Sequence, residues 1–156
     1  MGGTEMSMRE RIAALVANGC RALDEERFED YLATCDPAFR YRIQVYSPEI
    51  RKQMVWLDLP LDEMRGLLEN VSRHLRTLDR LQRNVGLVTA NPTAGTRWEA
   101  DSSFAVYATD RDGISRLFAV GRYRDTVETG SGVPLLLARD VLLQTRDLGV
   151  GLHVPL

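Results

Sequence analysis

Apolar residues in the first part of the chain recur at the spacing of a helix. The run Ser7-Met8-Arg9-Glu10 is a capping box, in which the serine hydroxyl and the glutamate side chain each bond the other residue's backbone amide. An apolar stripe follows through about residue 23, formed by Ile12, Leu15, Val16, Gly19 and Leu23. The acidic cluster at 24–26 favours the start of a second helix, which carries Phe28, Tyr31 and Leu32. We therefore expect two consecutive helices.

The pattern then changes to a period of two. The segment FRYRIQVY, residues 39–46, alternates apolar with polar positions and predicts a half-buried strand. Residues 47–59 lack clean periodicity, so we expect an irregular connection there. Pro60 at a first helical turn, followed by Asp62 and Glu63, predicts a third helix that ends in basic residues near residue 76.

The period of two returns at residue 81. Turn signals at 91–95, 110–113 and 130–132 divide the remainder into four strands of an antiparallel meander, the last three spanning about 97–109, 114–128 and 133–147. Helices followed by a long, curled sheet are typical of an α+β domain in which the sheet wraps around the first helix. We expect one such domain over residues 7–156, preceded by a flexible lead at 1–6.

The composition argues against some classes of binding partner. The formal net charge is -2, and the 20 basic and 22 acidic residues are mixed along the chain, which does not favour nucleic acid or anionic lipid. Cys20 and Cys35 lack the spacing of a metal or redox motif and suit two reduced thiols. With neither a secretory signal nor a span of about 18 apolar residues, we expect a cytoplasmic location.

The chain has few residues that could bind a metal or act in catalysis. A Rieske cluster or a mononuclear iron site needs more histidine and cysteine ligands than His74 and His153 supply, so no metal or cofactor is expected in this chain. Both histidines are expected in surface or packing roles. Carboxylates that could act as general acid or base lie on the predicted strands at Asp101, Asp125 and Asp140, but exposed or salt-bridged positions are the expectation. We assign no catalytic residue.

The segment GRYRD, residues 121–125, leaves two interpretations open. Arginine and tyrosine are enriched at protein interfaces, so Arg122 and Arg124 are candidates for a binding face. A solvated strand face with cross-strand pairs to Asp140 or Glu99 explains the same residues.

The order of these segments resembles the β subunit of aromatic-ring-hydroxylating and related Rieske oxygenases over nearly the whole chain. The resemblance is carried by segments that occur in the same order: ALDEERFEDYLATC with DPAFRYRI at 22–43, LQRNVGLV at 81–88, FAVGRYRDTV at 118–127 and ARDVLLQTRDLGVGLHVPL at 138–156. The segment SPEIRKQMVWLD at 47–58 and the ending LGVGLHVPL are most similar to small subunits grouped with methanesulfonate monooxygenase.

The resemblance implies a cone of the cystatin-like or nuclear-transport-factor-like type, with N-terminal helices packed on a curved, mainly antiparallel sheet. It also implies a structural role in a hexamer of three α and three β subunits that hydroxylates an aromatic or small organic substrate. The Rieske [2Fe-2S] cluster and the mononuclear iron are then expected in the partner α subunit. The recurring family positions, candidates for interface or scaffold roles, are Arg83, Asn84, Gly121, Arg122 and Arg124.

Two alternatives stay open on the same fold. One is an independent isomerase- or dehydratase-like enzyme, and the other is a ligand-binding protein with a pocket inside the cone. An interior packed shut by Tyr41, Phe104 and Phe118 favours the subunit, whereas an open pocket that holds Asp101 or His74 favours an enzyme.

Overall fold

The computed structural model describes residues 3–74, 79–148 and 155–156. Its helices and strands follow one another in the order α1 (Met8–Asp24), α2 (Phe28–Ala33), β1 (Cys35–Ser47), β2 (Lys52–Pro60), α3 (Leu61–His74), β3 (Arg80–Val85), β4 (Thr89–Pro92), β5 (Arg97–Thr109), β6 (Ser115–Glu128) and β7 (Leu135–Leu143).

The capping box and the pair of consecutive helices are confirmed. The Glu10 N–H donates to Ser7 Oγ at 3.3 Å, and the Ser7 N–H donates to the Glu10 carboxylate at 2.7 Å. The apolar stripe predicted for the first helix is buried in α1. The short helix α2 follows, and it buries Tyr31 and Leu32. The amphipathic pattern therefore predicts both the start of α1 and the face that it turns to the sheet.

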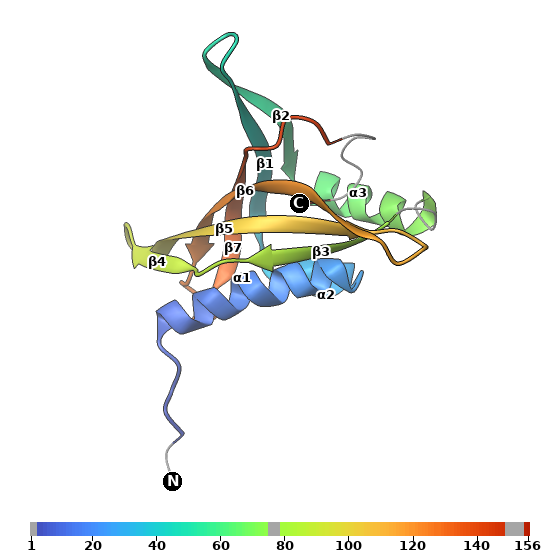
Figure 1. Cartoon of the computed structure of the whole chain (residues 1–156). Coiled ribbons are helices and arrows are strands. Elements are labelled where there is room, and N and C mark those ends of the chain that lie inside the picture. The colour runs from blue at the N-terminus through green and yellow to red at the C-terminus, as the bar shows by residue number, and fades with distance from the viewer. Residues whose placement is uncertain (1–2, 75–78, 149–154) are drawn as a thin grey trace.

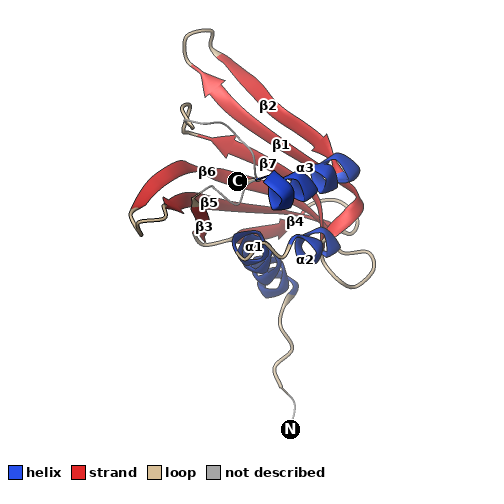
Figure 2. Ribbon diagram, turned by 90° about the vertical axis from the view of Figure 1, so that its right-hand side faces the viewer, coloured by secondary structure: helices blue, strands red, loops and turns tan. Residues whose placement is uncertain are grey.

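The strands form a curved sheet in the order β2-β1-β7-β6-β5-β3, with β4 also paired to β5. Strands β1 and β7 run parallel, and the other neighbours are antiparallel. Helix α1 contacts β3 and β4, while α3 contacts β1 and β2, so the helices cover the inner face of the curl (Figures 1 and 2). The expected α+β cone, with N-terminal helices on a mainly antiparallel sheet, is confirmed.

The expectation of an irregular connection at 47–59 is wrong. This stretch forms the turn of a hairpin and then β2, which pairs with β1. Ile43 pairs with Leu57 while Gln44 pairs with Val55, so Trp56 is an extra residue in β2. Such a β-bulge interrupts the period of two, and the exposed edge position of β2 removes the apolar face that usually marks a strand.

The meander differs from its prediction in two places. Its first strand is divided into β3 and β4, because residues 86–88 lie opposite only Ser102 and Ser103 of β5. Gly86 permits this irregularity, since a Cβ atom there would lie 2.5 Å from Ser103 Oγ. The last strand, expected to reach residue 147, ends at Leu143.

The core lies between the helices and the inner face of the sheet. Its fully buried side chains include Ile12, Tyr31, Phe39, Tyr41, Ile43, Met64, Tyr123, Leu136 and Leu156. Within the described residues, no helix is both long enough and apolar enough to span a membrane.

Candidate functional site

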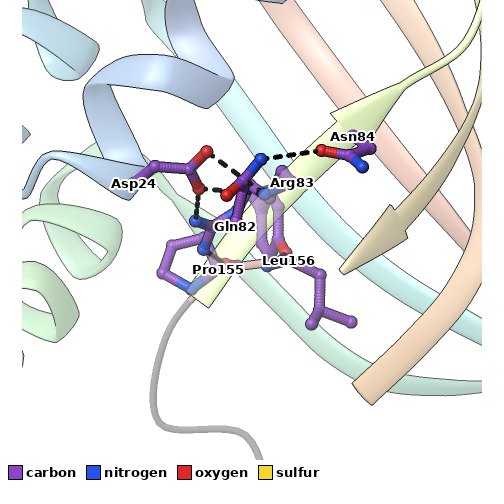
Figure 3. Close-up of polar contacts among 7 residues, drawn as sticks. Asp24, Gln82, Arg83, Asn84, Pro155 and Leu156 are labelled. Carbon is purple, nitrogen blue, oxygen red and sulfur yellow. Dashed lines mark hydrogen bonds and ion pairs between the residues drawn. The ribbon is translucent and has the colours of Figure 1, made fainter. Parts of the chain in front are cut away.

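Arg83 on β3 is a buried cation that joins distant parts of the chain. Its backbone N–H lies 3.1 and 3.2 Å from the two carboxylate oxygens of Asp24, and its Nη1 donates to Asp24 Oδ1 at 2.6 Å. Its Nη2 donates to the carbonyl oxygen of Pro155 (Figure 3). Asp24 ends α1, where the helix dipole disfavours a negative charge, and the arginine offsets that cost. Arg83 therefore ties α1, β3 and residue 155 together.

Leu156, the neighbour of Pro155, lies inside the cone. Its side chain is fully buried, and its N–H donates to the Tyr41 hydroxyl at 2.9 Å. Tyr41 on β1 is also fully buried, and burial raises the pKa of its phenol to about 12, against a smaller lowering by the Leu156 N–H. The phenol is therefore neutral near pH 7 and keeps both a donor and an acceptor for partners in the interior.

Asp125 on β6 and Arg139 on β7 form an ion pair in the core. The Nε and Nη2 atoms of Arg139 donate to the two carboxylate oxygens of Asp125 at 2.8 and 3.0 Å, and the two side chains are 1% and 0% exposed. The guanidinium carbon lies 4.0 Å from the centroid of the Tyr123 ring. Because both oxygens of Asp125 accept from the arginine, this geometry suits a structural ion pair better than a general base.

Further polar groups surround this pair. Burial raises the pKa of the Tyr31 and Tyr123 phenols well above their ordinary value. Among the described residues, neither phenol hydroxyl has a hydrogen-bond partner, and the same is true of Arg139 Nη1. The Tyr123 ring stacks on Phe104 with a centroid separation of 4.3 Å. The interior therefore combines aromatic packing with neutral hydroxyl groups.

Gly121 on β6 allows close packing of the sheet against this interior. A Cβ atom at this position would lie 2.5 Å from the carbonyl oxygen of Leu142 and 2.9 Å from the ring of Phe104. Real Cβ atoms essentially never approach other atoms so closely. A side chain at residue 121 would therefore force apart β6, β7 and the ring of Phe104.

A hollow of about 1000 Å³ opens on the outer face of the sheet, away from the helices. Alternation along the strands turns Tyr123 inward and its neighbours Arg122 and Arg124 outward into this hollow. Amide and hydroxyl side chains complete much of its polar lining, among them Gln44, Gln53, Asn84, Ser103 and Gln144. The hollow therefore offers many hydrogen-bonding groups and little net charge besides the two arginines.

Within the described residues, Arg122 and Arg124 form long ion pairs with Asp101 and Glu99. Arg122 lies 3.9 Å from Asp101, and Arg124 lies 3.6 Å from Asp101 and 3.8 Å from Glu99. By contrast, Arg42, Arg65 and Arg116 approach their carboxylates to 2.7–2.9 Å. The cross-strand pair predicted with Glu99 is present, as the interpretation of a solvated strand face requires. Its length exceeds that of a hydrogen bond, so the interpretation as a binding face also stays open. The expected alternative pair with Asp140 does not form, since Asp140 accepts from Arg42 and Gln44.

The remaining sequence candidates are not gathered into one site. Asp101 and Asp140 are partly exposed and ion-paired on the outer face, as expected, whereas Asp125 is fully buried. His74 ends α3, its side chain lies outside the described part of the structure, and His153 falls among the residues that are not described. Among described residues, no group of three histidine, cysteine or carboxylate side chains is arranged to hold a metal.

Sequence reasoning missed Arg139 and the placement of Leu156. A signal for the buried pair was present, because the alternation that turns Tyr123 and Val127 inward also turns Asp125 inward. An inward carboxylate needs a cation, and Arg139 faces it across the β6–β7 pairing. No local pattern indicates that residues 155 and 156 lie against β1 and β3.

No family model matches the chain. Its sequence is 31% identical over 145 residues to the β subunit of 2-aminobenzenesulfonate 2,3-dioxygenase from Alcaligenes sp., a match that covers 93% of this chain and 97% of that protein. It is 30% identical over 143 residues to the β subunit of the methanesulfonate monooxygenase hydroxylase from Methylosulfonomonas methylovora, covering 86% of this chain and 79% of that protein.

Among solved structures, the fold is similar to the β subunit of an aromatic-ring-hydroxylating dioxygenase from Novosphingobium aromaticivorans. The TM-score is 0.83 at 16% identity, with 95% of this chain and 96% of that chain covered. This likeness supports the fold, and the two relatives in sequence support the family because their matches extend over most of both proteins. The predicted resemblance is confirmed: the chain belongs to the family of small β subunits of Rieske-type oxygenase hydroxylase components.

Proposed function

We propose that the chain is the assembly subunit of a hydroxylase whose catalytic α subunit carries the Rieske [2Fe-2S] cluster and the mononuclear iron. The observation that carries this proposal is the sequence match over 93% of the chain to a dioxygenase β subunit. The chain's two histidines are too few to supply those metal sites, which agrees with their location in a partner. Three α and three β subunits form the proposed assembly, in the cytoplasm, where the two unpaired cysteines remain reduced.

The substrate class is part of the same proposal. The names of both relatives refer to sulfonates, one aromatic and one a small aliphatic compound. We therefore expect the hydroxylase to act on an aromatic or small organic substrate and favour a sulfonate. The relatives support the subunit rather than an independent isomerase or dehydratase. Tyr41 and Phe104 are also buried in the interior, while Phe118 is partly buried against it.

The proposed family positions divide into scaffold and interface roles. Arg83 and Gly121 are scaffold residues in this proposal, because one joins α1 to β3 and the other permits close strand packing. Asn84, Arg122 and Arg124 are interface residues, because they line the outer hollow. The arginine donors have no short contact with Asp101 or Glu99, so carboxylate or carbonyl oxygens of the α subunit suit them as acceptors.

The test is co-expression of this chain with a Rieske oxygenase α subunit from the same organism. The mass and composition of the purified complex are measured by native mass spectrometry, and oxygenase turnover is measured on a panel of sulfonates. The double variant Arg122→Ala with Arg124→Ala should weaken binding to the α subunit by about tenfold or more, since buried interface arginines are frequent energetic anchors.

The matched control is Arg116→Ala, another exposed arginine on β6, which pairs with Asp79 at 2.8 Å outside the hollow. It should leave the complex unchanged. Equal complex formation by the double variant and the control would remove the hollow from the interface. A chain that never forms a complex with the α subunit would contradict the proposed function itself.

A further inference from the structure

The described end of the chain occupies the inside of the cone in the manner of a bound ligand. Leu156 is fully buried among the core residues, and Pro155 is also buried. Both contacts that hold them run to residues distant in sequence, 72 positions away for Arg83 and 115 for Tyr41. We propose that the interior beside Arg83 and Tyr41 is a binding site for an N-acylated aliphatic amino acid, which the chain's own residues 155 and 156 fill.

The cationic side of this site is held in place by Asp24. The Arg83 side chain is 3% exposed, and Asp24 fixes it through the Nη1 contact at 2.6 Å. That contact leaves Nη2 free to donate to the carbonyl oxygen of residue 155. A buried guanidinium donor is costly to leave without an acceptor, so the site selects an occupant with a carbonyl oxygen at this point.

The second anchor lies on β1, separated from β3 by three strands in the sheet order. The Tyr41 hydroxyl accepts the N–H of Leu156 at 2.9 Å, and its own burial excludes competing water. The carbonyl oxygen that accepts from Arg83 and the N–H that donates to Tyr41 belong to one peptide bond. Because that bond is planar and trans, the two anchors together recognise a single amide group in a single orientation.

The third part of the site is the apolar surrounding of the Leu156 side chain. The Leu156 side chain lies in the core cluster together with Ile12, Tyr41 and Tyr123. A branched aliphatic group next to the amide is therefore the remaining requirement. N-acetyl-L-leucine presents the same order of groups: the acetyl carbonyl takes the place of Pro155 O, the amide N–H that of Leu156 N, and the isobutyl group that of the leucine side chain.

The experiment uses the whole chain with only residues 155 and 156 removed. This variant should melt at a lower temperature than the intact chain, because an apolar side chain and two hydrogen bonds are lost. N-acetyl-L-leucine at ten times its dissociation constant should raise the melting temperature of the variant by about 3–6 °C. Calorimetric titration measures the affinity, which should be on the order of millimolar for so small a ligand.

Controls separate the three parts of the site. N-acetylglycine has the amide without the isobutyl group and should not stabilise the variant. The intact chain should not bind N-acetyl-L-leucine, because its tethered residues compete at a high effective concentration. Adding Tyr41→Phe to the truncated chain should weaken the ligand by about tenfold, since the N–H then lacks an acceptor.

A second variant keeps the inference testable if the truncated chain does not fold alone. Leu156→Ala retains both amide contacts and leaves an apolar space, which should take up xenon, detected by its NMR shift. Recovery of the folded circular dichroism spectrum of the truncated chain on addition of N-acetyl-L-leucine would also support the site. An unchanged melting temperature after truncation, equal binding of N-acetylglycine, or absence of xenon uptake by Leu156→Ala would overturn it.

Discussion

Buried polar side chains distinguish the interior of this protein at the level of single residues. Asp125 pairs with Arg139, and Asp24 pairs with Arg83, so a short ion pair offsets part of the cost of burying each charge. The alternation of β6 predicts the inward direction of Asp125, but residue type alone favoured exposure. The partner of a buried charge depends on strand register, which a single sequence does not provide.

The buried phenols predict a loss of stability in alkali. In the unfolded chain a tyrosine ionises near pH 10, whereas burial raises the pKa of Tyr41 to about 12 in the folded chain. The contribution of Tyr41 to the free energy of unfolding should therefore be unchanged below pH 10 and should fall between pH 10 and 12. Tyr41→Phe should make that decline less steep by about 1.4 kcal/mol per pH unit, measured by urea denaturation at a series of pH values.

The control for this experiment is Tyr107→Phe, which removes a phenol that is 40% exposed. Its stability should follow the same pH dependence as the unaltered chain. If the free energy of unfolding of the Tyr41→Phe variant fell with pH as steeply as that of the unaltered chain, the Tyr41 phenol would ionise in the folded state as it does in the unfolded state.

Regular elements were predictable where their pattern is uninterrupted. The capping box at Ser7 and the alternation in residues 39–46 correspond to α1 and β1. The strand β2 was missed because Trp56 forms a bulge, and the break between β3 and β4 was missed because residue 86 departs from the ladder. Both failures have one cause, since an extra residue moves every later side chain to the opposite face.

Two glycines in different elements should respond oppositely to the same change. Gly121→Ala on β6 should destabilise the fold by about 1–3 kcal/mol, because the added methyl group meets Leu142 O at 2.5 Å and the ring of Phe104. Gly66→Ala in α3 meets nothing within 4 Å and should stabilise by roughly 0.5–1 kcal/mol through helix propensity. Chemical denaturation of both variants measures the difference. A neutral Gly121→Ala would mean that β6 and β7 can move apart at no cost.

At the scale of the whole molecule, the outer hollow and the β1–β2 hairpin form one continuous surface. The outer hollow includes Tyr46 and Gln53 at the β1–β2 hairpin, which projects from the body (Figure 1). Ile50 at the turn of the hairpin and Val55, which pairs with Gln44 of the hollow, are 58% and 54% exposed. The sequence predicted an irregular connection at 47–59 and not the hairpin that presents these apolar side chains. The hollow depends on contacts between strands that are far apart in sequence. In the sequence, the family resemblance was the evidence for how these strands are arranged.

The hairpin therefore predicts a second contribution to assembly. The double variant Ile50→Ser with Val55→Ser should reduce recovery of the complex with the α subunit by about tenfold, while the lone chain keeps its melting temperature. The matched control, Ile114→Ser, changes a side chain that is 64% exposed at the turn between β5 and β6. Pull-down with a tagged α subunit compares the recovery of the double variant with that of the control. Equal recovery would indicate that the hairpin stays outside the interface.

The parallel pairing of β1 with β7 has a consequence for synthesis on the ribosome. Arg42 of β1 and its ion-pair partner Asp140 of β7 are 98 residues apart in sequence. A nascent chain therefore exposes one hydrogen-bonding edge of β1 until β7 emerges, and an open strand edge readily pairs with other chains. Slower translation between the two strands should lengthen that exposure and increase aggregation, so the yield of soluble protein depends on how quickly the ribosome reaches β7.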